Sequence, residues 1–228
     1  KITTTIDMNV QNASTEAVDG QLQSLQEDAR AAAVTIDPAS GAVRGYFGGH
    51  ESTGWDYANA GLQTGSTFKI FALAAALQQG IGLDTYYSSA PYQLPGSQVV
   101  TNGSGGCGNC FIAEVLKNSF NTSFLRLQAD LENGTQDTAD MAHALGIAKS
   151  LPGIEKTLTE NGGAPYEGVV LGQYQSRPLD MASAMATLTN GGVWHQPHFV
   201  QKVETTGGEV LYEFNDNGGE RRVSADRK

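Results

Sequence analysis

The order of strand-like and helix-like segments limits this chain to few folds. Residues 33–36 and 42–47 are short runs rich in β-branched and aromatic side chains. They flank residues 37–41, Asp-Pro-Ala-Ser-Gly, which form a turn signal, so the pattern predicts a hairpin. Because two strands alone are marginal in water, this hairpin must join a larger sheet or pack on helices.

Apolar residues at helical spacing dominate the segments that follow. Helices are predicted over residues 66–79, 112–131, 137–145 and 178–189, with glycine near most of their exits. Residues 199–203 and 209–214 return to strand around Gly207 and Gly208. A strand pair, a block of helices and a second strand pair predict an α+β fold, and argue against the βαβ order of a nucleotide-binding Rossmann sheet.

The charge of the chain excludes one class of partner. Its 228 residues carry a formal net charge of −10, and the basic residues do not cluster before Arg221 and Arg222, so we expect no binding to nucleic acid. No apolar run approaches the ~20 residues that cross a bilayer. The sequence begins with Lys1 instead of methionine, and we expect a piece of a longer protein.

The only cysteines, Cys107 and Cys110, lie together in a glycine-rich loop. Half a zinc site would need further ligands, and the histidines show no matching spacing, so no metal site is predicted. A small disulfide is the preferred interpretation, with free thiols as the alternative. If the disulfide forms, the compartment is oxidising.

Ser66 and Lys69 stand at i and i+3 at the start of a predicted helix, so their side chains share one face. A lone Ser-x-x-Lys also fits a serine N-cap followed by a solvated lysine. However, Lys69 precedes Ile-Phe-Ala-Leu, a run that is apolar nearly all round and predicts burial. To act as a base near neutral pH, its pKa must fall from ~10.4 by about three units, mainly through desolvation.

A second pair of polar side chains lies on a turn between helical segments. Ser119 and Asn121 are two residues apart and would face the same cleft, where a hydroxyl relays a proton and an amide holds a substrate carbonyl. Alone, the pair also fits a capping serine and a turn asparagine.

Further motifs follow one another through nearly the whole chain. They are residues 3–7 (Thr-Thr-Thr-Ile-Asp) with Gln11, residues 33–49, Asp56-Tyr57-Ala58, Gly65 to Lys69, Ser119 to Thr122, Leu171-Gly172-Gln173, residues 178–182 and Asn190-Gly191-Gly192. In order and spacing this set resembles the transpeptidase domain of a class A penicillin-binding protein.

The resemblance implies the penicillin-binding and serine β-lactamase-like fold, with helices packed on an antiparallel sheet. It implies a DD-transpeptidase without cofactor that cross-links peptidoglycan stem peptides ending in D-Ala-D-Ala to an acceptor amine. Ser66 would be the nucleophile, Lys69 the general base and Ser119 the proton relay. Asn121 would orient the substrate, and the Ser66 backbone amide would hold the oxyanion. β-Lactams would acylate Ser66.

The resemblance also implies a place in the cell. Such enzymes work at the extracytoplasmic face of the bacterial membrane, and a membrane anchor and a glycosyltransferase domain would precede Lys1, which makes the whole protein bifunctional.

One motif of the family does not occur here. Its Lys-Thr-Gly segment binds the substrate carboxylate and supplies a second oxyanion amide, but residues 156–158 read Lys-Thr-Leu and 149–151 read Lys-Ser-Leu. Losing one oxyanion donor slows such reactions ~10² to 10³-fold. We therefore expect residues 1–228 to be the N-terminal major part of the domain, without its C-terminal strands. A second chain or fragment would carry the rest, after cleavage beyond Lys228.

Two other functions fit parts of the pattern. A serine β-lactamase shares Ser-x-x-Lys, but no segment resembles the Glu-x-x-Leu-Asn deacylation loop, and the middle triplet is Ser-Phe-Asn instead of Ser-Asp-Asn. A binding module, either a β-lactam sensor or a degenerate scaffold, would keep the fold without turnover.

Overall fold

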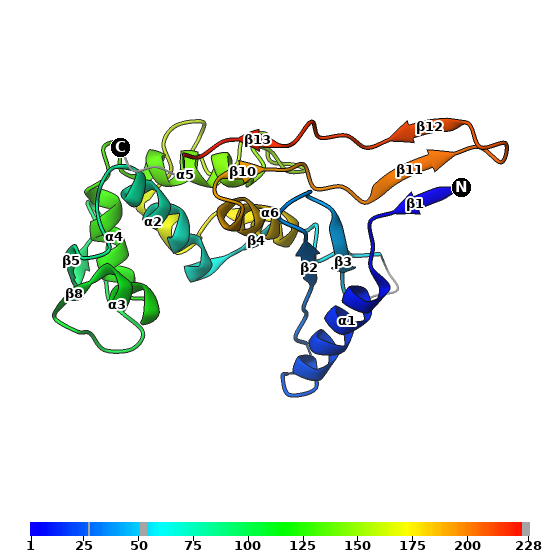
Figure 1. Ribbon diagram of the computed structural model, residues 1–228. Coiled ribbons are helices and arrows are strands. Elements are labelled where there is room, and N and C mark those ends of the chain that lie inside the picture. Colours follow the sequence, from blue (N-terminus) through cyan, green and yellow to red (C-terminus); the bar gives the residue numbers. More distant parts are fainter. Residues whose placement is uncertain (27, 51–53, 225–228) are drawn as a thin grey trace. The chain divides into compact units, whose positions relative to one another are not determined.

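The computed structural model describes residues 1–26, 28–50 and 54–224 (Figure 1). The chain forms two compact units. The first unit comprises Lys1–Leu62, Leu145–Ile147 and Ser176–Val223, and the second comprises Gln63–Ala144, Ala148–Gln175 and, among the described residues, Ser224. The chain passes between the units within β4 (Leu62–Gln63) and β9 (Gln175–Ser176). The cleavage expected beyond Lys228 lies outside the described residues.

The first unit combines helices α1 (Met8–Leu22) and α6 (Pro178–Thr189) with short strands. The strands are β1 (Ile2–Thr4), β2 (Ala33–Ile36), β3 (Val43–Phe47), β10 (Val193–Trp194), β11 (Val200–Glu204), β12 (Val210–Glu213) and β13 (Glu220–Arg221). An antiparallel sheet has the order β1-β11-β12, and β10 pairs with β13. The predicted C-terminal strand pair is therefore confirmed as β11 and β12, each shifted by one residue at its start.

The predicted hairpin is confirmed as β2 and β3. The two strands are antiparallel, with Ala33 opposite Phe47 and a bulge between Thr35 and Ile36. Alternate residues of β3, among them Val43 and Phe47, are buried, because α1 packs along β3 and α6 packs along β2 (Figure 1). In this structure the hairpin thus lies between helices.

Helix α1 was not predicted, because none of its residues is buried and its apolar spacing is weak. The Asp7 side chain caps its first turn by accepting from the amides of Asn9 and Val10. Gln11 then pairs with the strand: its Nε2 donates to the Tyr46 carbonyl (3.0 Å), and its Oε1 accepts from the Tyr46 amide (2.7 Å). A helix held by polar contacts of this kind shows no hydrophobic periodicity in its sequence.

The Thr5 hydroxyl ties neighbouring segments of the first unit together. Thr5 is 4% exposed, and its Oγ1 lies 2.7 Å from the carbonyl of Val43 and 3.0 Å from that of His198. Replacing Thr5 with valine keeps the shape but removes this buried donor to the Val43 carbonyl, whereas the His198 carbonyl keeps its bond from the Val43 amide. We therefore expect the free energy of unfolding to fall by about 1 to 3 kcal/mol. Urea unfolding of the intact protein measures it. Thr3→Val, at an exposed position of β1, is the control, and an equal effect there would contradict the prediction.

The second unit is mainly helical. Its helices are η1 (Gly65–Phe68), α2 (Lys69–Gln78), α3 (Ile112–Lys117), α4 (Asn121–Ala129), α5 (Thr135–Leu145, whose last residue belongs to the first unit) and η2 (Glu167–Leu171). Its paired strands are β5 (Tyr86–Ser88) with β8 (Asn109–Phe111), and β6 (Tyr92–Gln93) with β7 (Val99–Val100). Helix α2 packs against α4, and η2 contacts η1, α2 and α4 (Figure 1).

The predicted helices of this unit need two corrections. The segment from Ser66 begins as a 3-10 turn, and α-helical geometry starts only at Lys69. The stretch 112–131 is two helices, because Ser119 has a left-handed backbone (φ 54°) that no α-helix accommodates. That break coincides with the predicted turn. Helix α5 starts two residues before the predicted 137. In the first unit, α6 begins and ends as predicted.

None of the helices among the described residues has the length and apolar character needed to cross a membrane.

Candidate active site

The side chain of Lys69 is the centre of a polar cluster in the second unit. Lys69 is the first residue of α2 and is completely buried. Its Nζ lies 3.0 Å from Ser66 Oγ, 2.9 Å from Ser119 Oγ, 2.7 Å from the Ser119 carbonyl oxygen and 2.7 Å from Asn121 Oδ1. The predicted burial of Lys69 and its approach to Ser66 are thus both confirmed.

Burial, more than the hydrogen-bond partners, decides the form of the amine. The Ser119 carbonyl and Asn121 Oδ1 can only accept, so they take two N–H groups of the lysine. A neutral amine then has its lone pair left for a proton of the Ser66 or Ser119 hydroxyl, and an ammonium would instead donate its third N–H to one of them, so the contacts suit both forms. Desolvation by burial lowers the pKa of Lys69 from 10.5 to about 8. The cluster therefore holds an amine that can accept a proton near neutral pH.

Ser66 occupies a different environment from Lys69. It lies in the first turn of η1 and is exposed, while the aromatic residues that follow it, Phe68 and Phe71, are buried. The local sequence explains this arrangement: Gly65 takes a left-handed backbone (φ 59°) that turns the chain into the helix, and the apolar run then fixes α2 in the core. The hydroxyl of Ser66 therefore faces solvent with a buried amine behind it.

Ser119 and Asn121 reach the same lysine from the break between α3 and α4. The left-handed backbone of Ser119 brings both its carbonyl and its hydroxyl to Nζ, a strained conformation of the kind that concentrates at functional sites. Asn121 is the first residue of α4 and contributes Oδ1. The structure thus brings together all four side chains that the sequence singled out.

Asn102 supports this cluster from a distant loop and was not predicted. The N-cap position of α4, Phe120, has no side-chain hydrogen bond to the helix, and the Oδ1 of Asn102 accepts instead from the amide (3.1 Å) and hydroxyl (3.2 Å) of Thr122. Its Nδ2 donates to the Ser89 carbonyl (2.9 Å). Only a long-range contact identifies this cap, so no local sequence signal could have revealed it.

Replacing Asn102 with alanine should loosen the first turn of α4, and with it Asn121. Loss of a helix cap typically costs about 0.5 to 2 kcal/mol, so we expect a lower thermal midpoint. Asn109→Ala, at an exposed position of β8, is the matched control. Thermal unfolding measures the effect, and a variant indistinguishable from the control would contradict the role given to Asn102.

A disulfide joins Cys107, in the loop before β8, to Cys110 within β8. Their sulfur atoms and a carboxylate oxygen of Glu114 all lie within 4.8 Å of one another, a spacing that would suit a metal ion. Metals bind the thiolate form, and both sulfurs are used in the disulfide. The disulfide therefore closes this loop covalently, and its sulfur atoms are not available as metal ligands in this state.

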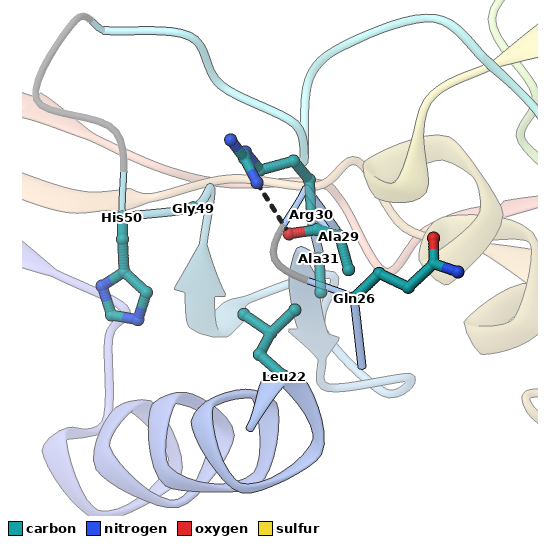
Figure 2. A pocket seen from close by; sticks show the side chains of 7 residues that line it. All are labelled: Leu22, Gln26, Ala29, Arg30, Ala31, Gly49 and His50. Atoms are coloured by element: carbon teal, nitrogen blue, oxygen red, sulfur yellow. Dashed lines mark hydrogen bonds between the residues drawn. The ribbon is translucent and has the colours of Figure 1, made fainter. Parts of the chain in front are cut away.

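A pocket of about 340 Å³ lies in the first unit and contains none of the predicted site residues (Figure 2). It is lined by Leu22, Gln26, Ala29, Arg30, Ala31, Gly49 and His50. Figure 2 shows Arg30 donating to the carbonyl of Ala29, and His50 bonds to Asp19. Arg30 and His50 thus already have protein partners, so the Lys69 cluster is the better candidate for chemistry.

Comparison with known families identifies which proteins the chain is similar to. The family model described as the penicillin binding protein transpeptidase domain matches residues 31–227. Penicillin-binding protein 1A of Mycolicibacterium smegmatis is 54% identical over 225 residues, which cover 97% of this chain and 29% of that protein. The chain therefore spans less than a third of this curated relative.

Solved structures give the same answer for the fold. The penicillin-binding protein PonA1 from Mycobacterium tuberculosis matches with a TM-score of 0.95 and 52% identity, over 99% of this chain and 59% of that one. The same protein in complex with penicillin V matches with a TM-score of 0.92 and 52% identity, over 99% and 60% of the two chains. The predicted fold is therefore confirmed.

Proposed function

The chain belongs to the penicillin-binding protein transpeptidase family, and from that premise we propose that it supplies the nucleophile and general base of a serine DD-transpeptidase. The observation that carries the proposal is a completely buried lysine amine 3.0 Å from the hydroxyl of an exposed serine. A solvated lysine after a helix cap would have neither the burial nor the four oxygen contacts.

The proposed reaction has two stages. Lys69 takes the hydroxyl proton as Ser66 Oγ attacks the carbonyl of the penultimate D-alanine of a stem peptide, and a tetrahedral oxyanion forms. The carbon–nitrogen bond then breaks, D-alanine leaves with a proton, and an ester joins the stem to Ser66. An amine of a neighbouring stem then attacks that ester, the carbon–oxygen bond to Ser66 breaks, a proton of the amine passes to Ser66 Oγ, and the new amide bond is the cross-link.

The other residues of the cluster have supporting roles in this proposal. Ser119 Oγ, 2.9 Å from Nζ, relays the proton from Lys69 to the leaving amine. The amide group of Asn121 orients the stem peptide while its Oδ1 holds Nζ, and the backbone amide of Ser66 stabilises the oxyanion. β-Lactams resemble the D-Ala-D-Ala end and would acylate Ser66. The penicillin V complex of the similar PonA1 protein supports this assignment.

A second chain or fragment would complete the domain. The outer edge of β3 is already used, because the backbone amide of Asp7 donates to the Arg44 carbonyl (2.9 Å) and the Gln11 side chain bonds to both backbone groups of Tyr46. The outer edge of β2 would therefore receive the further sheet strands, one of which carries the Lys-Thr-Gly segment.

A working site at the extracytoplasmic face of the membrane agrees with the Cys107–Cys110 disulfide, since such bonds persist in oxidising compartments.

Two assays on the intact protein test the proposed function. Fluorescent penicillin should give one long-lived adduct per molecule, and donor and acceptor stem peptides should give a cross-linked product. Rapid turnover of nitrocefin would instead identify a β-lactamase, and labelling without cross-linking would identify a sensor. Intact mass also tests the second chain: folded, penicillin-binding material that contains only the 24.0 kDa piece would contradict it.

A further inference from the structure

We propose that Gly172 is a positioning residue for Ser66: the absence of a side chain at this position lets η2 pack directly against the backbone that precedes the nucleophile. This inference rests on the proposed function of Ser66. Gly172 ends η2 in a left-handed conformation (φ 72°, ψ 34°). It lies far from Ser66 in the sequence, and it has no side chain that could join the Lys69 cluster.

The close approach is to the backbone of Gly65, the residue directly before Ser66. A Cβ atom on Gly172 would lie 2.4 Å from the Gly65 nitrogen, 2.3 Å from the Gly65 oxygen and 2.6 Å from Thr64 Oγ1. Real Cβ atoms essentially never come within 3.0 Å of another group, and two of these three atoms are backbone. A flexible side chain could rotate away from such a collision, whereas here the backbone itself must move.

The η2 side of this contact is firmly held. Val169 and Val170 are completely buried, and the carbonyl of Glu167 accepts a hydrogen bond from Gln128 of α4 (3.0 Å). The Gly172 amide donates to the Val169 carbonyl (3.0 Å), which closes the turn. Since η2 is packed in the core of the second unit, a side chain at Gly172 displaces the segment around Gly65 more readily than η2.

The Gly65 side lies at the surface, where both residues of β4 are exposed and β4 pairs with β9. Gln63 is exposed, and its Nε2 donates to the Gln173 carbonyl (2.9 Å), which joins the two segments at the surface. Lys69 lies beyond the buried Phe68 and is fixed in α2. A shift of Gly65 therefore moves Ser66 relative to an amine that stays in place, and changes the 3.0 Å separation between Ser66 Oγ and Lys69 Nζ.

The test compares Gly172→Ala with Gly153→Ala in the intact protein. Gly153 also has a left-handed backbone (φ 80°), but nothing lies within 4 Å of a Cβ built there, so both variants carry similar backbone strain and only one carries the collision. We expect the acylation rate constant for penicillin to fall about 10²-fold in Gly172→Ala, with little change in the dissociation constant of the non-covalent complex. Gly153→Ala should acylate as the wild type does.

The pH profile separates positioning from general destabilisation. If Ser66 moves away, water reaches Lys69, whose low pKa comes from desolvation, so the midpoint of the acylation profile should rise in Gly172→Ala and stay near 8 in Gly153→Ala. If Gly172→Ala acylates like Gly153→Ala with an unchanged profile, the inference is wrong while the proposed function stands. Failure of the wild type to form any adduct would instead defeat the proposed function.

A second variant covers the case in which Gly172→Ala does not fold. Gln63→Ala removes only the surface hydrogen bond between the two segments and leaves both glycines in place. We expect its acylation rate constant to fall about fivefold, again without a change in non-covalent affinity. A wild-type rate constant in this variant would overturn the inference.

Discussion

The Ser66→Ala variant is expected to form no covalent adduct with penicillin. Without Oγ there is no atom at this position that can attack the lactam carbonyl, so the loss is complete instead of partial. Because Ser66 is exposed and Lys69 Nζ keeps its contacts with Ser119 and Asn121, the variant should remain folded. Intact mass spectrometry after incubation with penicillin measures the adduct, and circular dichroism establishes that the variant is folded.

Ser123→Ala is the matched control for this experiment. Ser123 is a buried serine of α4 whose Oγ donates to the Ser88 carbonyl (3.0 Å), and Arg126 also bonds that carbonyl, so its loss leaves the acceptor satisfied. We expect this control to form the adduct at nearly the wild-type rate. A penicillin adduct on Ser66→Ala would show that another residue is the nucleophile.

Much of the fold could be predicted from the sequence where buried residues recur at a regular apolar spacing. The hairpin of β2 and β3 and helix α6 follow from apolar spacing and from the turn residues at their ends. The burial of Lys69 could be predicted in the same way, since the residues after it are apolar on nearly every face of α2. In these places the local pattern and the tertiary packing agree.

The rest could not be predicted, because it depends on contacts between distant segments. Helix α1 has no buried residue and is held by polar groups such as Gln11. The cap that Asn102 gives to α4 is visible only once the loop is folded. Gly172 was recognised as part of a motif, but its sequence neighbours do not reveal that it touches Gly65.

The left-handed backbone of Ser119 is a further case. Serine has no special preference for that conformation, so the sequence predicted a turn there but not the geometry that aims both a carbonyl and a hydroxyl at one amine. Strained positions of this kind are where local sequence rules are expected to fail, because the surrounding structure imposes them.

The Lys69→Met variant is expected to acylate about 10² to 10⁴-fold more slowly than the wild type, the usual contribution of a general base. Methionine has nearly the same length but no lone pair to take the Ser66 proton. It relieves the desolvation of a completely buried amine but also removes the donor to the Ser119 carbonyl and Asn121 Oδ1, so we expect the thermal midpoint to change little. Lys117→Met, at an exposed position in the last turn of α3, is the control and should acylate normally.

The pH dependence of acylation distinguishes a base from a merely structural lysine. With a pKa of about 8, roughly a tenth of Lys69 is neutral at pH 7, so the wild-type rate constant should rise about tenfold per pH unit below 8 and level off above it. The group is active when deprotonated, and the rate therefore falls as pH falls. In Lys69→Met this pH dependence of the acylation rate constant should disappear. If the variant keeps the same pH dependence, or loses stability in proportion to its rate, Lys69 is not the base that takes the proton of Ser66.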